Sequence, residues 1–166
     1  MQDPTGFADF VRSRYDALAR SAYLLTGDRG HAEDLVQAAL MTTLKAWDRL
    51  AVTEAAESYT RTTMVRAAQR AARRRWRREI PTDWHQLSGD RTAPESAATA
   101  VDVRTALASL PWEQRAVLVL RFFDDLSERE TATLLGCSEG TVKSRTSRAL
   151  ATLRASGLVQ TEAHDG

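Results

Sequence analysis

The spacing of apolar residues constrains this chain more than any other feature of its sequence. In residues 7–50 and again in residues 103–153, apolar side chains recur every three or four positions, the repeat of an α-helix with one buried face. No stretch shows the sustained alternation of a half-buried strand. Residues 80–100 lack both patterns and contain Pro81 and Pro94, which is typical of a linker. We therefore expect an all-α protein with two small helical domains joined by a flexible linker.

The domain boundaries follow from the same patterns. The first domain is predicted to cover residues 1–79, the linker 80–101, the second domain 102–155 and a tail 156–166. A chain of 166 residues with 43% apolar content suffices for one ordinary domain or two small ones. A linker of about twenty residues, at ~3.3 Å each, spans roughly 65 Å. That is about two turns of DNA, so the two domains can contact separate sites on one duplex.

Three helices are expected in the first domain. Apolar residues of 7–25 fall on one helical face, and Asp28 is a suitable N-cap for a second helix that ends near Leu50. Residues 51–57 are predicted to form a loop. A third helix is expected over residues 58–78.

The second domain is expected to contain more helices than the first, and their start signals are clearer. Residues 103–110 carry a short apolar stripe, and Pro111 suits the first position of a helix that runs to Arg121. Ser127 and Glu130 have the spacing of a capping box for the next helix.

Residues 127–153 have the pattern of a helix-turn-helix. Gly136 supplies the positive φ that the turn needs, Ala132 is small where the helices cross, and Val142 is apolar early in the second helix. An ordinary helical hairpin with a solvated polar face would show any one of these elements, but their complete order favours DNA binding. Outward positions carry hydroxyls and cations that suit phosphates and base edges in a major groove: Ser138, Thr141, Lys143, Ser144, Arg145, Ser147 and Arg148.

Positive charge is concentrated in one stretch, although the net charge is only +1. Residues 61–78 contain no acidic residue, which indicates a local binding site for a polyanion. The first sixty residues contain more acidic than basic residues, which indicates a separate surface for a different partner. A solvated face or a nonspecific nucleic-acid tail would also explain the tract. Trp76 among the arginines, and Tyr59 near the start of the same helix, favour stacking on exposed bases instead. The tract contains Arg61, Arg66, Arg70, Arg73, Arg74, Arg75, Arg77 and Arg78.

Region 4 of the extracytoplasmic-function sigma factors (group IV of the sigma-70 family) resembles two adjacent segments of this chain, LASLPWEQRAVLVLRFFDDL and SERETATLLGCSEGTVKSRTSRALATLR. The resemblance implies that this domain recognises the −35 promoter element and contacts the polymerase β flap. Thr146 and Ser147 stand where family members often carry larger apolar or aromatic residues. The DNA contacts that the resemblance implies are Arg121, on a phosphate, and Ser138, Gly140, Thr141, Lys143, Ser144, Ser147 and Arg148.

Region 2 of the same family, especially of its actinobacterial-type members, resembles FADFVRSRYDALARSAYLLTGDRGHAEDLVQAALMTTLKAW. The resemblance implies that the helix bearing AEDLVQ docks on the clamp helices of the polymerase β′ subunit. Asp34, Gln37 and Met41 share one stripe of that helix and are the expected contacts.

The following segment corresponds to the part of region 2 that captures an unstacked base of the −10 element. Arg66 stands where relatives commonly carry an asparagine, and an arginine lacks the paired donor and acceptor of the amide. The resemblance implies that the −10 contacts are Tyr59, Arg66, Gln69, Arg70 and Arg73.

The resemblance covers most of the chain apart from the linker and the tail. It implies a sigma factor that binds core RNA polymerase and directs promoter recognition, DNA opening and transcription initiation. An anti-sigma factor is a common partner in this family, although no residue here specifies one. One alternative is a LuxR-type transcriptional regulator, which has a similar Thr141-Val142-Lys143 stretch but usually carries an α/β sensor domain in front. Another is an adaptor that binds polymerase or RNA without recognising promoters.

Other chemistry finds little support in the sequence. It contains no nucleotide-binding glycine loop, paired catalytic carboxylates or nucleophile elbow, so neither enzymatic activity nor a cofactor is expected. His31 does not converge with Glu33 and Asp34 at helical spacing, so no metal site is expected. Hydrophobic segments are short, the start lacks the features of a signal peptide, and the single Cys137 excludes an internal disulfide. These features predict a cytoplasmic protein without a membrane span.

Overall fold

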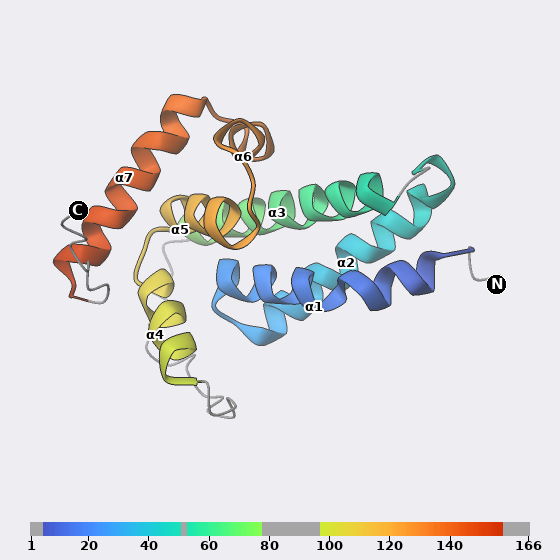
Figure 1. The fold of residues 1–166 in the computed structure, drawn as a ribbon, viewed down its shortest axis with the longest axis horizontal. Helices are drawn as coiled ribbons and strands as arrows, with labels where there is room; N and C mark the ends of the chain where they lie inside the picture. The colour runs from blue at the N-terminus through green and yellow to red at the C-terminus, as the bar shows by residue number, and fades with distance from the viewer. Residues whose placement is uncertain (1–4, 51–52, 78–96, 158–166) are drawn as a thin grey trace, which may run out of the picture. The chain divides into compact units, whose positions relative to one another are not determined.

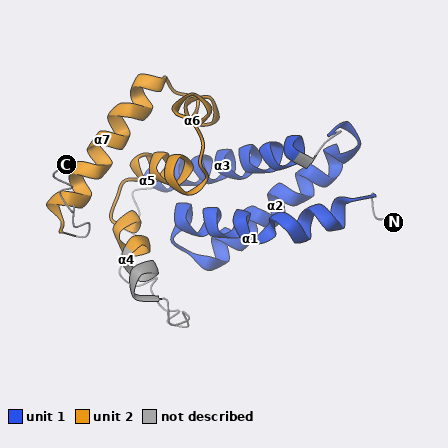
Figure 2. Ribbon diagram, in the orientation of Figure 1, with its two compact units in different colours: residues 1–80 blue, residues 81–166 orange. Residues whose placement is uncertain are grey.

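The computed structural model describes residues 5–50, 53–77 and 97–157. Within these residues the chain is helical and has no strand. It divides into two compact units, residues 1–80 and residues 81–166 (Figures 1 and 2). The all-α prediction is therefore confirmed. The predicted tail and most of the predicted linker lie outside the described residues, but helix α4 already begins at Ala97.

The first two helices of unit 1 lie where the sequence predicts them. Helix α1 (Phe7–Thr26) ends at Gly27, whose φ of 69° terminates the helix in the left-handed region. Asp28 then caps α2 (Arg29–Ala46), because its side chain accepts a backbone N–H of the first turn at 3.0 Å. A short 3₁₀ turn, η1 (Trp47–Arg49), follows directly.

Helix α3 (Thr53–Arg77) begins earlier than the sequence predicts. The predicted loop over residues 51–57 is wrong from Thr53 onward, since the helix starts there and not near Ser58. Alanine and glutamate are strong helix formers, and Glu54 complements the positive end of the helix dipole. Ala56 is also fully buried, so packing favours the early start.

The core of unit 1 lies between its three helices. Phe10, Leu25, Val36 and Met64 are buried there. Apolar residues spaced three or four apart on each helix supply this core, as the sequence pattern predicts.

Two threonines share a hydrogen bond inside this core. Thr43 of α2 and Thr60 of α3 are fully buried, and their hydroxyl oxygens lie 2.7 Å apart. Each hydroxyl also lies within 2.9 Å of the carbonyl oxygen four residues earlier in its own helix. The two helices are therefore joined by a polar contact as well as by apolar packing.

Unit 2 contains the helix-turn-helix. The caps predicted for it are present: Ser127 and Glu130 form a capping box, with bonds of 3.0 and 2.7 Å. Gly136 has a φ of 69°, and Ser138 accepts the backbone N–H of Thr141 at 3.1 Å. The helices of the unit are α4 (Ala97–Ala108), α5 (Trp112–Leu118), the π-helical turn η3 (Val119–Phe123), α6 (Glu128–Leu135) and α7 (Glu139–Ala155).

The interior of unit 2 holds one charged residue among the apolar ones. Val142, Ala149 and Leu153 of α7 are buried, and Leu150 is half-buried. Arg115 of α5 is only 3% exposed.

Candidate nucleic-acid and polymerase interfaces

One face of α7 carries the residues predicted to contact the −35 element. Ser138, Gly140, Lys143, Ser144, Ser147 and Arg148 are exposed, and Thr141 is half-buried. This face lies opposite Val142 and Ala149, which pack inward. The structure therefore brings the predicted α7 contacts to one solvent-facing surface.

Two cations of α7 already have acidic partners within unit 2. The Lys143 ammonium lies 3.6 Å from a carboxylate oxygen of Glu128 on α6. Arg145 lies 3.5 Å from Glu113 on α5, and its side chain is only 23% exposed. The prediction that Arg145 points outward is therefore wrong, because the packing of α5 against α7 turns it toward Glu113.

Two further arginines support the turns of unit 2. Arg121, predicted to contact a phosphate, donates from Nη1 to the carbonyl oxygen of Leu126 at 2.6 Å and lies over the Phe122 ring. Arg115 donates to the carbonyl oxygens of Leu107 and Leu110 at 2.9 and 3.0 Å. The sequence motifs predict no role for Arg115, although an arginine inside an otherwise apolar stretch indicates a buried cation that needs acceptors.

A row of arginines runs along the exposed side of α3. Arg66, Arg70, Arg73 and Arg77 are spaced four, three and four residues apart, so they share one face, and all four are exposed. We call these four residues the arginine stripe. Tyr59 lies on the same face and is half-buried, and Gln69 is half-buried at its edge. Arg77 extends the stripe beyond the residues that the sequence predicted.

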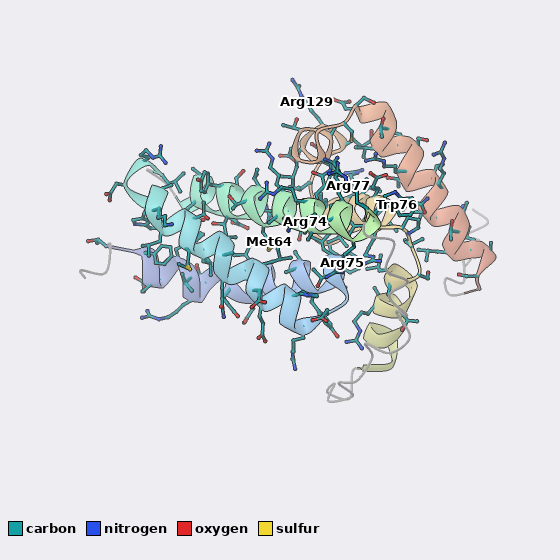
Figure 3. The ribbon with its side chains drawn as sticks, turned by 180° about the vertical axis from the view of Figure 1, so that it is seen from behind. Met64, Arg74, Arg75, Trp76, Arg77 and Arg129 are labelled. Carbon is teal, nitrogen blue, oxygen red and sulfur yellow. The ribbon has the colours of Figure 1, made fainter. Side chains whose placement is uncertain are left out.

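Other arginines of the tract contact the protein itself. Arg75 approaches the α2 residue His31, with 2.8 Å between its Nη2 and the imidazole Nδ1. Arg61 pairs with Glu57 at 3.1 Å. The side chains of Arg74, Arg75, Trp76 and Arg77 surround the last turn of α3 (Figure 3). The tract therefore has an inner and an outer set of arginines, which its composition alone did not separate.

The predicted docking stripe of α2 is also exposed. Asp34, Gln37 and Met41 are open to solvent, and the Met41 side chain is 62% exposed. Val36 and Ala39, on the opposite side of the helix, are buried. An exposed methionine between polar residues is suited to a partner surface, because its side chain adapts to irregular apolar contacts.

Within the described residues, no group of three or more histidine, cysteine, aspartate or glutamate side chains is placed to hold a metal ion. No helix among them has the length and hydropathy needed to cross a membrane.

Comparison with known proteins decides the family. Residues 10–78 match Sigma-70 region 2, and residues 100–153 match Sigma-70 region 4. The RNA polymerase sigma-E factor of Streptomyces avermitilis is 40% identical over 89% of this chain and 83% of its own length. The ECF RNA polymerase sigma factor SigM of Mycobacterium tuberculosis is 33% identical over 91% of this chain and 76% of its own length. The chain belongs to the extracytoplasmic-function sigma factors.

A solved sigma factor has the same fold. The structure of the sigma factor RpoE in complex with the anti-sigma factor NepR, from Bartonella quintana, superposes with a TM-score of 0.75 at 25% identity. It covers 96% of this chain and 99% of that chain.

The two family matches assign the candidate surfaces of this sigma factor to different regions. The region 2 match contains the arginine stripe and the docking stripe, and the region 4 match contains the helix-turn-helix. A LuxR-type regulator is not favoured, since the front half matches region 2 and is helical.

Proposed function

We propose that this sigma factor binds core RNA polymerase and directs it to promoters, with region 4 on the −35 element and region 2 on the −10 element and the polymerase. The observation that carries this proposal is the presence of both sigma regions in order, each with an exposed surface of suitable chemistry. Duplex readout needs hydroxyls and cations on a helix that enters the major groove. Capture of opened DNA needs cations and aromatic side chains.

For the −35 element, the contacts are the exposed face of α7. Gly140 supports this assignment, because a Cβ built there would meet the Ser138 hydroxyl at 3.8 Å, an ordinary contact. The fold therefore does not require glycine at this position, whereas close approach of DNA to the helix would. The proposed contacts are Ser138, Gly140, Thr141, Lys143, Ser144, Ser147 and Arg148, with a remaining N–H of Arg121 on a phosphate.

For the −10 element, the contacts lie on α3. Tyr59, half-buried on the same face as the arginine stripe, would stack on an unpaired base, and the exposed arginines would bind the phosphates of the opened strand. Opening is favoured because the unpaired bases gain contacts that duplex DNA cannot make. The proposed contacts are Tyr59, Arg66, Gln69, Arg70 and Arg73.

For the polymerase, Asp34, Gln37 and Met41 of α2 are the proposed contacts with the β′ clamp helices. Region 4 would contact the β flap. These contacts need no catalytic group or cofactor in this chain, so we propose a non-catalytic protein that acts in the cytoplasm. An anti-sigma factor is the partner class that would hold it inactive.

Run-off transcription tests the proposed function. Purified core polymerase is mixed with this chain and a library of genomic promoter fragments, and the RNA start sites are mapped. A sigma factor yields RNA from defined starts, and core enzyme alone does not. Neither a LuxR-type regulator nor an adaptor confers initiation on core enzyme, so the absence of defined starts would contradict the proposal.

A further inference from the structure

The exposed side of α2 continues beyond the predicted docking stripe. Four exposed residues lie along it at spacings of four, three and four: Asp34, Ala38, Met41 and Lys45. Because a helix has about 3.6 residues per turn, residues at this spacing form one row along its surface. From Asp34 to Lys45 the row is about 16 Å long, at ~1.5 Å per residue. We call these four residues the docking row.

The spacing within the docking row indicates a helical partner. Two pairs of its residues are seven positions apart, Asp34 with Met41 and Ala38 with Lys45. This repeat of two positions in seven is the pattern by which one helix packs along another. The small Ala38 lets a partner backbone come close, and Met41, which is 62% exposed, supplies an adaptable apolar contact. The docking row therefore suits a helix of another protein.

Opposite charges stand at the two ends of the docking row. Neither Asp34 nor Lys45 has an ion-pair partner within the described residues. Other exposed charges do, for example Asp9 with Arg12 at 2.8 Å. Asp34 and Lys45 are separated by about three helical turns, too far to pair with each other. A partner helix that covers the row therefore needs a cation opposite Asp34 and an acid opposite Lys45.

A second copy of this chain and the polymerase are the two partners to compare. A second copy in antiparallel orientation would place its own Asp34 opposite Lys45. A stable interface usually buries roughly 800 Å² on each partner, however, and the docking row offers Met41 as its single large apolar side chain. The polymerase suits the row better, because region 4 is proposed to attach to the same enzyme. A second attachment compensates for a small contact.

We infer that Lys45 is a further docking contact, which pairs with an acidic side chain of the polymerase clamp helices while Asp34 pairs with a basic one. Opposite charges at the two ends favour one register, because a shift by one helical turn separates both pairs. The register in turn places α3, which is joined to α2 through Thr43 and Thr60, at a defined position on the enzyme. The inference rests on the proposed docking of α2.

Reversing the charge of Lys45 tests this contact. The full-length chain, labelled with a fluorophore at its amino terminus, is titrated with core polymerase at low and at high salt, and anisotropy gives the affinity. Lys45→Glu should weaken binding roughly tenfold at low salt, since two like charges would then face each other. The loss should shrink at high salt, because salt screens exposed charges. Lys45→Arg keeps the charge and should bind like the wild type.

A double reversal separates register from net charge. Asp34→Lys combined with Lys45→Asp leaves the net charge unchanged but inverts the direction of the charges along the docking row. This variant should bind core polymerase at least as weakly as Lys45→Glu, since both pairs become repulsive. Arg20→Glu is the matched control, because it makes the same change of charge as Lys45→Glu on the exposed side of α1. It should leave core binding unchanged.

A thermal melt of each variant identifies effects on the fold. Lys45 lies in the last turn of α2 and complements the negative end of the helix dipole, so Lys45→Glu should lower the melting temperature slightly. A role confined to the helix dipole would lower stability without a salt-dependent loss of core binding.

Three results would overturn the inference. They are wild-type affinity of Lys45→Glu for core polymerase, recovery of that affinity by the double reversal, and a wild-type dimer in sedimentation that Lys45→Glu dissociates. The last result would assign the docking row to a second copy of the chain. Failure of the proposed function differs from all three, because the wild-type chain itself would then yield no start-site-specific RNA.

Discussion

The exposed faces of α3 and α7 offer nucleic acid different chemistry. The arginine stripe of α3 presents four cations, none of which has an ion-pair partner within the described residues. The face of α7 presents mainly hydroxyls, and its Lys143 already lies near Glu128. Unpaired arginines supply affinity for phosphates of any sequence, whereas hydroxyls and a positioned cation discriminate between bases. From this comparison we propose that α3 holds DNA and α7 selects it.

Replacing the whole arginine stripe should have the largest effect. Substitution of Arg66, Arg70, Arg73 and Arg77 with Gln removes four proposed phosphate contacts, so holoenzyme binding to forked −10 DNA should fall by roughly a hundredfold or more at low salt. The slope of log affinity against log salt concentration should fall by about 0.7 per arginine for a single strand. Fluorescence anisotropy across a salt series measures both quantities.

The matched control leaves the DNA surface intact. Asp34→Ala combined with Gln37→Ala should reduce capture of core polymerase in pull-downs without changing the salt slope. An unchanged slope in the Arg→Gln variant would mean that α3 does not bind phosphates, and the contrast with α7 would be lost.

Replacing one cation of α7 should have a smaller and more specific effect. Arg148→Ala should lower transcription from −35-dependent promoters by roughly ten- to a hundredfold, the range expected for loss of a bidentate base contact. Binding of core polymerase should not change. Run-off yields on promoters with intact and scrambled −35 elements measure the specific loss, and equal losses on both templates would show that Arg148 contributes charge alone.

Gly140→Ala separates fold from recognition. The added methyl group has room in the free protein and lies in the first turn of a helix, so thermal stability should stay the same or rise slightly. Affinity for −35 duplex should drop about tenfold if DNA approaches this backbone closely, since a methyl group would then clash with it. A thermal melt and a mobility shift on the same preparation test both expectations, and unaltered affinity would remove Gly140 from the interface.

The smallest expected effect comes from the partner of Lys143. Glu128→Gln releases the ammonium and removes a negative charge beside the α7 face, so affinity for nonspecific duplex should rise about two- to threefold, typical of an exposed ion pair. Affinity for the −35 site should rise less, so the ratio of specific to nonspecific binding should decline. A competition assay with bulk DNA measures this ratio, and a constant ratio would show that Glu128 plays no part in selection.

Sequence predicted most reliably what depends on neighbouring residues. The capping box at Ser127 and the turn at Gly136 were found because each requires residue types at fixed short spacing. The exposed faces of α2 and α7 followed from helical periodicity in the same way, whereas the α3 residues were implied by the resemblance to region 2.

Contacts between distant residues escaped prediction. Arg145 turns toward Glu113, and Arg75 toward His31, because another helix lies beside each of them, and no local pattern records that neighbour. The early start of α3 at Thr53 was missed for a related reason. Its first turn has no apolar stripe, and the burial of Ala56 becomes visible only in the packed unit.

The buried Thr43 and Thr60 hydroxyls have a consequence for how this interface can change. Three short oxygen–oxygen contacts share two protons, so either threonine can donate to the other while its partner donates to its own helix. If valine replaces one of them, the remaining hydroxyl still has a carbonyl acceptor one turn earlier. Evolution can therefore replace this polar contact between α2 and α3 with an apolar one, one substitution at a time. No intermediate would bury a hydroxyl donor without an acceptor.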